Sequence, residues 1–81
     1  MAAESNASSL VALGQVVRSL RIARGLTQEG LAEASGLHPR YVSDVERGRR
    51  NIGFLNLERL GAVLAGDMAT FMAAFDAQRR R

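Results

Sequence analysis

Apolar residues recur every three or four positions along most of the chain, a spacing that gathers them on one face of a helix. The first such run consists of Leu10, Leu13, Val16, Val17 and Leu20. It predicts a first helix from about Leu10 to Arg24, which Gly25 ends. Residues 1–9 are small and polar and show no periodicity, so we interpret them as a disordered N-terminal arm.

Two short helices are expected next, each with its own start and stop signals. Thr27 is a good capping residue for a helix from about Gln28 to Ser35, and Gly36 ends that helix. Pro39 occupies the first position of the following helix, from about Pro39 to Arg47. The few residues between the two helices leave no room for an antiparallel reversal, so the helices should cross steeply, as in a helix-turn-helix.

Two more helices complete the predicted fold. The fourth ends at Gly66 and is indicated by apolar residues at helical spacing, namely Phe54, Leu57, Leu60 and Leu64. Asp67 can cap a fifth helix, whose large apolar residues form one stripe of Met68, Phe71, Met72 and Phe75. No useful stretch alternates with period two, so no strand is predicted. The expected fold is all-α with about five short helices: a helix-turn-helix domain over residues 10–66, a C-terminal helix over residues 67–78 and a basic tail over residues 79–81.

Length and composition exclude several classes of protein. The 81 residues are enough for one small domain. The chain has no cysteine and a single histidine, His38, so neither a disulfide framework nor a zinc site is expected. No set of residues supports a nucleophile with its base, and we expect no catalytic residue, metal or cofactor. Neither a membrane span nor a secretory signal is apparent, so we expect a cytoplasmic protein.

The distribution of charge points to a partner. The net charge is +3, and all 11 basic residues are arginine, whose planar guanidinium can bind phosphate or guanine through two hydrogen bonds. At about 100° per residue, Val42 and Val45 fall on the core side of the third helix. The opposite side carries Arg40, Ser43, Asp44 and Arg47, and the helix is followed by Arg49 and Arg50. This exposed stripe is a candidate reader of the DNA major groove, with phosphate contacts at its rim.

Several short segments occur in the order and spacing of a known family. They are Leu20-Arg21, Arg24-Gly25-Leu26-Thr27-Gln28-Glu29, Leu31-Ala32, Ser35-Gly36-Leu37, Tyr41-Val42-Ser43 and Val45-Glu46-Arg47-Gly48-Arg49-Arg50-Asn51. Over residues 16–64 the sequence resembles the Cro and lambda-repressor type (XRE family) of helix-turn-helix DNA-binding proteins, and the length of the match is far more specific than a lone motif. Within that family it is most similar to small stand-alone members, such as restriction-modification controller proteins and the antitoxins of toxin modules.

This resemblance implies DNA contacts for two groups of residues. Contacts with base edges are implied for Arg40, Tyr41, Ser43 and Asp44. Contacts with the sugar-phosphate backbone are implied for Thr27, Gln28, His38, Arg49, Arg50 and Asn51. Two alternatives stay open, because Asp44 could orient Arg40 or Arg47 rather than touch a base, and His38 could be only a turn residue.

The family also has an ion pair between its first helix and its recognition helix, which the resemblance assigns to Arg21 and Glu46. The helical spacing supports this assignment independently. It places Glu46 on the core-facing side of the third helix, next to Val42, where a carboxylate needs a partner. We therefore expect the pair to lock the first helix to the third.

The apolar stripe of the last helix suggests a second copy of the chain as a partner. Its residues Met68, Phe71, Met72 and Phe75 exceed what the core of such a small domain should need. In the family the segment after the fourth helix commonly forms a two-fold interface, so we expect a homodimer through these four residues. Two recognition helices about 34 Å apart would then read inverted half-sites on double-stranded DNA.

The expected function is therefore sequence-specific regulation of transcription by a homodimer bound to an inverted-repeat operator, as in restriction-modification controllers. We expect neither a small-molecule ligand nor a membrane partner. The alternative, from another class, is an antitoxin: a protein-interaction module that neutralises a partner and binds its operator secondarily.

Overall fold

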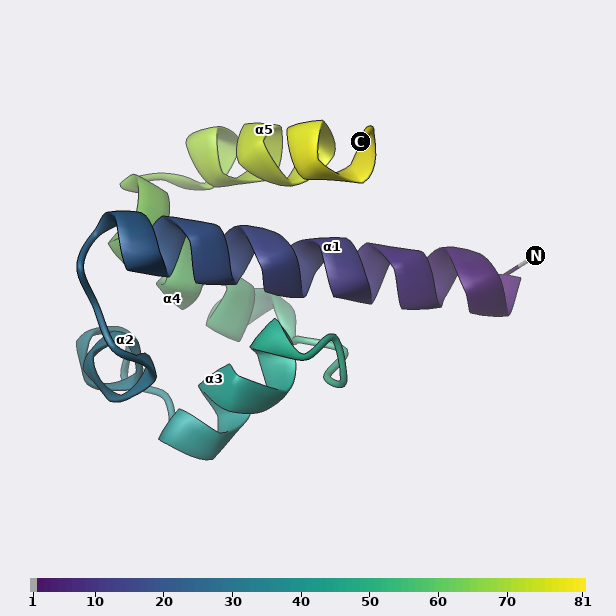
Figure 1. The fold of residues 1–81 in the computed structure, drawn as a ribbon. Coiled ribbons are helices and arrows are strands. Elements are labelled where there is room, and N and C mark those ends of the chain that lie inside the picture. The colour runs from purple at the N-terminus through teal and green to yellow at the C-terminus, as the bar shows by residue number, and fades with distance from the viewer. Residues whose placement is uncertain (1) are drawn as a thin grey trace.

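The structure, a computed structural model, describes residues 2–81, with side chains from Ser8 onward. This part of the chain forms five helices and no strand, in agreement with the predicted all-α fold (Figure 1). The helices are α1 (Ala2–Ala23), α2 (Gln28–Ser35), α3 (Pro39–Glu46), α4 (Phe54–Ala65) and α5 (Met68–Arg79).

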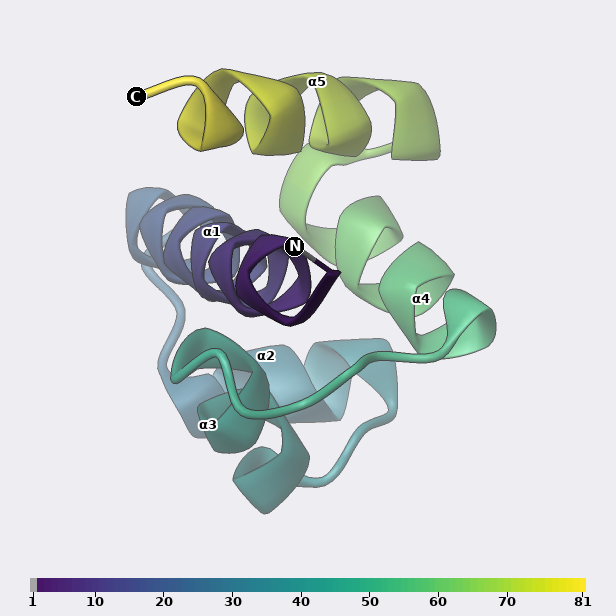
Figure 2. The same cartoon turned by 90° about the vertical axis from the view of Figure 1, so that its right-hand side faces the viewer.

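The longest helix, α1, lies in the middle of the molecule. α2 and α3 lie on one side of it and α5 on the opposite side, while α4 packs against α1, α2 and α5 (Figure 1, Figure 2). α4 and α5 meet at a bend of 90°. No single helix in the described residues is long and apolar enough to cross a membrane; only α4 and α5 taken together reach that length and composition. Within residues 2–81, this arrangement leaves the outer side of α3 without a covering helix (Figure 1).

All five helices contribute to one core. The largest fully buried side chains in it are Val17, Leu31, Val42, Val45, Leu60 and Phe71. Val42 and Val45 lie on the inner side of α3, where the helical spacing places them. Apolar burial contributes roughly 25 cal/mol per Å² to folding, so these two valines help to hold α3 against the core. The charged residues on the outer side of α3 do not contribute to this apolar packing.

Gly14 allows α1 to pass directly over the end of α3. A Cβ atom at this position would lie 2.5 Å from the carbonyl oxygens of both Val45 and Glu46, too close for any side chain. Inside a helix, glycine costs about 1 kcal/mol relative to alanine. At Gly14 the close approach of two helices therefore outweighs local helix propensity.

The largest departure from the predicted helix boundaries is at the N-terminus. The first helix begins at Ala2 instead of Leu10, so residues 2–9 are helical and not a disordered arm; Met1 lies outside the described residues. Alanine and glutamate are strong helix formers, and extending an existing helix needs no new nucleation. At the other end α5 continues to Arg79, so the basic tail begins inside a helix.

Candidate nucleic-acid interface

Three local features define the start of α2 and the turn between α2 and α3. The Thr27 hydroxyl accepts a hydrogen bond from the Gly30 backbone at 2.9 Å and caps α2. Gly36 ends α2 in the left-handed conformation, with φ of 74°. His38 caps α3, because its Nδ1 accepts a hydrogen bond from the Arg40 backbone at 3.0 Å, and Pro39 follows as the first residue of the helix. These features set the steep crossing that exposes one side of α3.

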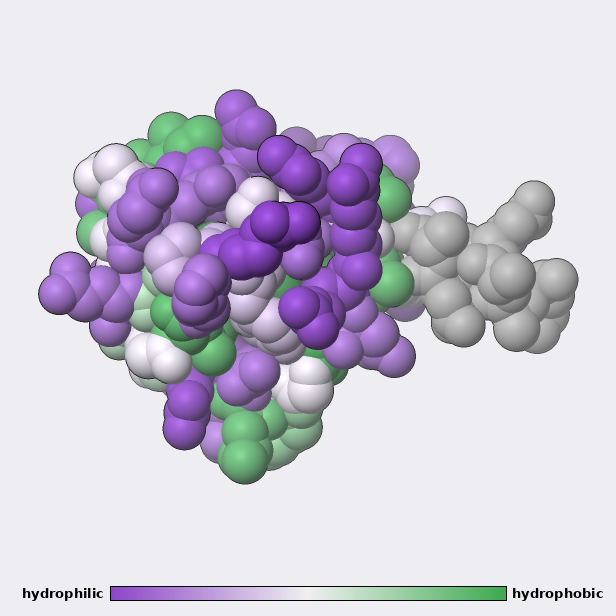
Figure 3. All heavy atoms as spheres, turned by 90° about the horizontal axis from the view of Figure 1, so that it is seen from below, coloured by the Kyte–Doolittle hydropathy of each residue, from purple (hydrophilic) through white to green (hydrophobic). Residues whose placement is uncertain are grey.

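The exposed side of α3 carries the residues predicted to contact bases. The side chain of Arg40 is 78% exposed, whereas Tyr41, Ser43 and Asp44 are partly buried and still reach the surface. Arg47, Arg49 and Asn51 are exposed at the end of the helix and in the following loop. Figure 3 views the molecule from the side of α2 and α3 and shows a face on which hydrophilic residues predominate.

Four of the predicted residues form a connected cluster on this face. Oδ1 of Asp44 lies 3.6 Å from Nε of Arg40, and Oδ2 lies 3.9 Å from Nη2 of Arg50. The guanidinium of Arg50 also lies over the ring of Tyr41, 4.6 Å from its centroid, as a cation–π contact. The residues come from both turns of α3 and the loop after it, and Asp44 joins them.

The expected ion pair between α1 and α3 is present. Nε of Arg21 donates to Oε2 of Glu46 at 2.6 Å, and Nη2 donates to Oε1 at 3.1 Å. The two side chains are only 12% and 4% exposed. The hydrogen bonding that Arg21 donates to Glu46 raises the pKa of Arg21 above its ordinary value, against the opposing effect of burial. The remaining guanidinium nitrogen donates to the carbonyl of Leu26 at 2.8 Å, so the same arginine also anchors the chain before α2.

Gln28 has a contact that the sequence did not indicate. Its side-chain amide donates to Oε1 of Glu46 at 3.0 Å, so it joins α2 to the same carboxylate that Arg21 holds. A primary amide has two N–H donors, and one of them is not needed for Glu46. Gln28 can therefore reach a phosphate only as part of this network, whereas Thr27 and His38 lie exposed at the starts of α2 and α3.

The prediction that Phe71 belongs to a pairing stripe on α5 is wrong. Phe71 is completely buried and packs against Gly61. Met68, Met72 and Phe75 are partly buried against the same core. The reason is tertiary: α5 folds back over α1 and α4 and uses its stripe to cover them.

Sequence reasoning missed two other apolar residues that the structure exposes. Phe54 and Leu55, at the start of α4, are 66% and 67% exposed. They lie in the first turn of α4, whereas the buried residues of that helix, Leu60, Gly61 and Leu64, lie in its later turns. The helical spacing of apolar residues gave no signal for this exposure, because it does not show how far along a helix the core extends.

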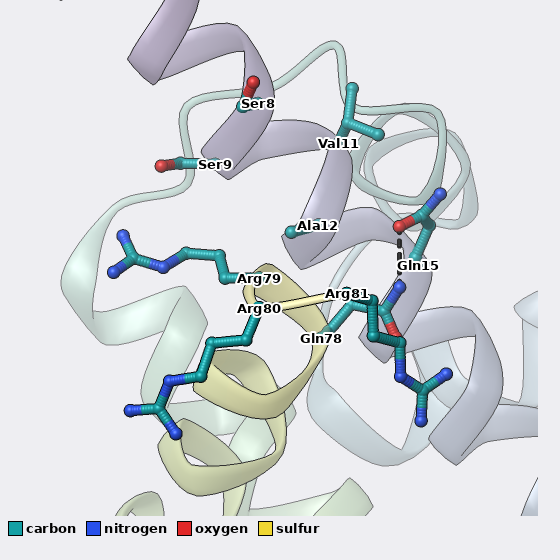
Figure 4. A pocket seen from close by; sticks show the side chains of 9 residues that line it. All are labelled: Ser8, Ser9, Val11, Ala12, Gln15, Gln78, Arg79, Arg80 and Arg81. Atoms are coloured by element: carbon teal, nitrogen blue, oxygen red, sulfur yellow. Dashed lines mark hydrogen bonds between the residues drawn. The ribbon is translucent and has the colours of Figure 1, made fainter.

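A hollow of about 550 Å³ lies between α1 and the end of α5 (Figure 4). Gln78 donates a hydrogen bond to Gln15 across it at 2.8 Å. The side chains of Arg79, Arg80 and Arg81 diverge from one another and do not converge on a common point. None of the residues predicted to contact DNA lines this hollow, and the described side chains contain no group of three or more potential metal ligands.

Comparisons with known proteins agree with this geometry. The helix-turn-helix family model matches residues 17–71. The control protein C.BamHI of Bacillus amyloliquefaciens is 42% identical over 52 residues, which are 63% of this chain and 64% of that protein. The controller protein C.Esp1396I, solved as a tetramer with its natural 35 base-pair operator, matches with a TM-score of 0.84 and 29% identity over 90% of this chain and 96% of that one. The clp gene regulator ClgR of Corynebacterium glutamicum matches with a TM-score of 0.80 and 32% identity over 89% and 77%. These relatives are named as a control protein, a restriction-modification controller protein and a gene regulator.

Proposed function

The chain belongs to the helix-turn-helix family, and from this membership we propose that it is a sequence-specific DNA-binding transcriptional regulator that acts as a homodimer on an inverted-repeat operator. The observation that carries the proposal is the outer side of α3, on which Arg40 is 78% exposed and which no other helix of the described residues covers. A helix of this size fits the major groove, where the guanidinium of an arginine can bind O6 and N7 of a guanine.

The rest of the interface positions α3 on the duplex. The N-terminus of α2, at Thr27 and Gln28, carries the positive end of the helix dipole and favours a phosphate. Arg49, Arg50 and Asn51 lie in the loop after α3 and extend the contact along the sugar-phosphate backbone. These contacts are independent of sequence, so the preference for one operator has to come from the α3 side chains.

The second copy binds through the start of α4 in this proposal. Phe54 and Leu55 are the most exposed of the large apolar side chains that the structure describes. Figure 2 shows the start of α4 at one side of the molecule, with α2 and α3 below α1 and α5 above it. A two-fold axis at that side leaves both α3 helices facing the same way, whereas pairing across the outer face of α5 would point them in opposite directions.

Among transcription regulators, the control proteins of restriction-modification systems are the class we propose. The similarity to C.BamHI, a control protein, and to C.Esp1396I, a restriction-modification controller protein, supports this class over the alternative of an antitoxin. The proposed mechanism is occupancy: a dimer bound at a promoter, in the cytoplasm, blocks polymerase or recruits it. Control then follows the concentration of the protein and its dimerisation.

Selection from a pool of random duplexes, followed by gel-shift titration at two salt concentrations, tests the proposal. The expected result is an inverted repeat whose half-sites lie about 34 Å apart. Arg40→Ala should weaken operator binding by roughly 1–3 kcal/mol and spare non-specific binding, while Arg49→Ala should weaken both and reduce the salt dependence. Arg80→Ala, which removes the same charge on the far side of the molecule, is the control. Failure to enrich any sequence would refute the proposal.

A further inference from the structure

Asp44 is an acidic side chain on the face that α3 would present to a polyanion. Its side chain is 23% exposed, and its two oxygens face different arginines, Arg40 at 3.6 Å and Arg50 at 3.9 Å. A carboxylate near DNA phosphates opposes binding unless cations neutralise it. Its presence at the centre of the arginine cluster therefore needs an explanation other than affinity.

We propose that Asp44 is a positioning residue, which holds the guanidinium of Arg40 for contact with a base edge and disfavours DNA on which Arg40 finds no acceptor. This inference rests on the DNA-binding function proposed above. It concerns sequence discrimination, which the contacts of Arg49, Arg50 and Asn51 with the backbone do not supply.

The geometry of the pair supports positioning. Asp44 lies nearest the Nε atom of Arg40, one turn away on the same helix, so both terminal nitrogens of the guanidinium remain available. A free arginine side chain that is 78% exposed samples many rotamers, and fixing it on a base costs conformational entropy. Restricting that motion before binding reduces the cost and favours the geometry that two hydrogen bonds to guanine require.

Asp44 is itself held from its other side. Arg50 lies near the second carboxylate oxygen, and its guanidinium rests on the ring of Tyr41, 4.6 Å from the ring centroid. Because Tyr41 belongs to α3, the helix itself orients this second cation beside Asp44. Both ion pairs are longer than hydrogen bonds and lie at the surface, where such pairs add little to stability. Removal of the Asp44 charge should therefore change DNA binding and leave the fold intact.

Discrimination also has a repulsive component. On the operator, Arg40 binds a base and stays beside Asp44, so the carboxylate remains neutralised. On another sequence Arg40 has no base acceptor and turns to the phosphates, which removes one of the two cations that neutralise Asp44 beside the negative duplex. Specific interfaces commonly combine an attractive contact with such a penalty for the wrong partner.

The test measures dissociation constants of the full chain for the selected operator and for a non-specific duplex of equal length. The proteins are wild type, Asp44→Asn, Arg40→Ala and the double variant, with Asp76→Asn on α5 as a control that removes the same charge elsewhere. We expect Asp44→Asn to tighten non-specific binding and to lower the ratio of specific to non-specific affinity about tenfold, the size of one base contact. In the Arg40→Ala background the same change should leave the ratio within about twofold.

Each other outcome has a definite meaning. An unchanged ratio for Asp44→Asn, or an equal fall in both backgrounds, overturns the positioning role; the second result would make Asp44 a direct base contact. A melting temperature for Asp44→Asn far below that of the wild type would make it a structural residue. If the wild type itself prefers no sequence, the proposed function fails first, and the inference fails with it.

Discussion

Arg21 holds the carboxylate of Glu46 through two hydrogen bonds, Nε to Oε2 at 2.6 Å and Nη2 to Oε1 at 3.1 Å. The residues lie 25 positions apart, on α1 and on the last turn of α3. Gln28 and the carbonyl of Leu26 complete the network, so three segments of the helix-turn-helix meet at one carboxylate. The orientation of α3 relative to α1 and α2 is therefore set by a polar network as well as by the valine core.

Replacement of Arg21 by Met tests the strength of this network. Glu46 is 4% exposed and would lose its cation, so we expect a loss of roughly 3–5 kcal/mol in the free energy of unfolding, measured with urea. The double variant Arg21→Met with Glu46→Leu should recover much of that loss, because it removes the unpaired charge. A midpoint barely changed by Arg21→Met would show that solvent or Gln28 alone satisfies the carboxylate.

Replacement of Gly14 by Ala should destabilise the protein although alanine is the better helix former. The new Cβ would lie 2.5 Å from two carbonyl oxygens at the end of α3, and overpacking of this kind costs about 1–3 kcal/mol. Gly61→Ala is the matched control, because its Cβ would meet Phe71 at an ordinary 3.4 Å. Thermal unfolding of both variants decides the point: equal melting temperatures would contradict the close packing of α1 on α3.

The double variant Phe54→Glu with Leu55→Glu should be monomeric. Dimerisation would bury two unpaired carboxylates in the proposed pairing surface, and burial of an unpaired charge costs a large free energy. Sedimentation equilibrium measures the mass, and gel shifts should show greatly weakened operator binding. Ile22→Glu, at a residue 55% exposed on α1, should remain dimeric. An intact dimer in the double variant would move the interface elsewhere, although not to Phe71, which has no exposed surface.

Asp67, which caps α5, should make the free energy of unfolding depend on pH in the acidic range. The backbone N–H of Thr70 donates to Asp67 at 2.7 Å and lowers the pKa of that carboxyl. A group with a lowered pKa in the folded state stabilises the protein above its unfolded pKa, and that contribution is lost as the pH falls through the folded value. Asp67→Asn keeps a capping side chain but cannot titrate, so the urea midpoint should fall less between pH 5 and pH 3, as judged by circular dichroism. Identical pH profiles for the two proteins would show that the cap does not contribute.

Features that depend on neighbours along the chain could be predicted from the amino-acid sequence. Thr27, Gly36 and Pro39 determine where α2 and α3 start and stop, because capping and left-handed turns involve residues only a few positions apart. The valines of α3 and its exposed arginine follow from the helical period alone. The partner of Glu46 came from the family resemblance, and the structure contains that pair.

Which apolar surfaces remain exposed depends on how the helices pack together, and the sequence pattern did not reveal it. Phe71 was predicted as part of a pairing stripe, but the return of α5 over α1 and α4 buries it against Gly61. Phe54 and Leu55 read as ordinary helix residues and prove to be exposed. Gly14 likewise gives no local sign that another helix passes over it. Periodicity identifies the apolar side of a helix, but what covers that side depends on contacts between residues far apart in the chain, which no local pattern contains.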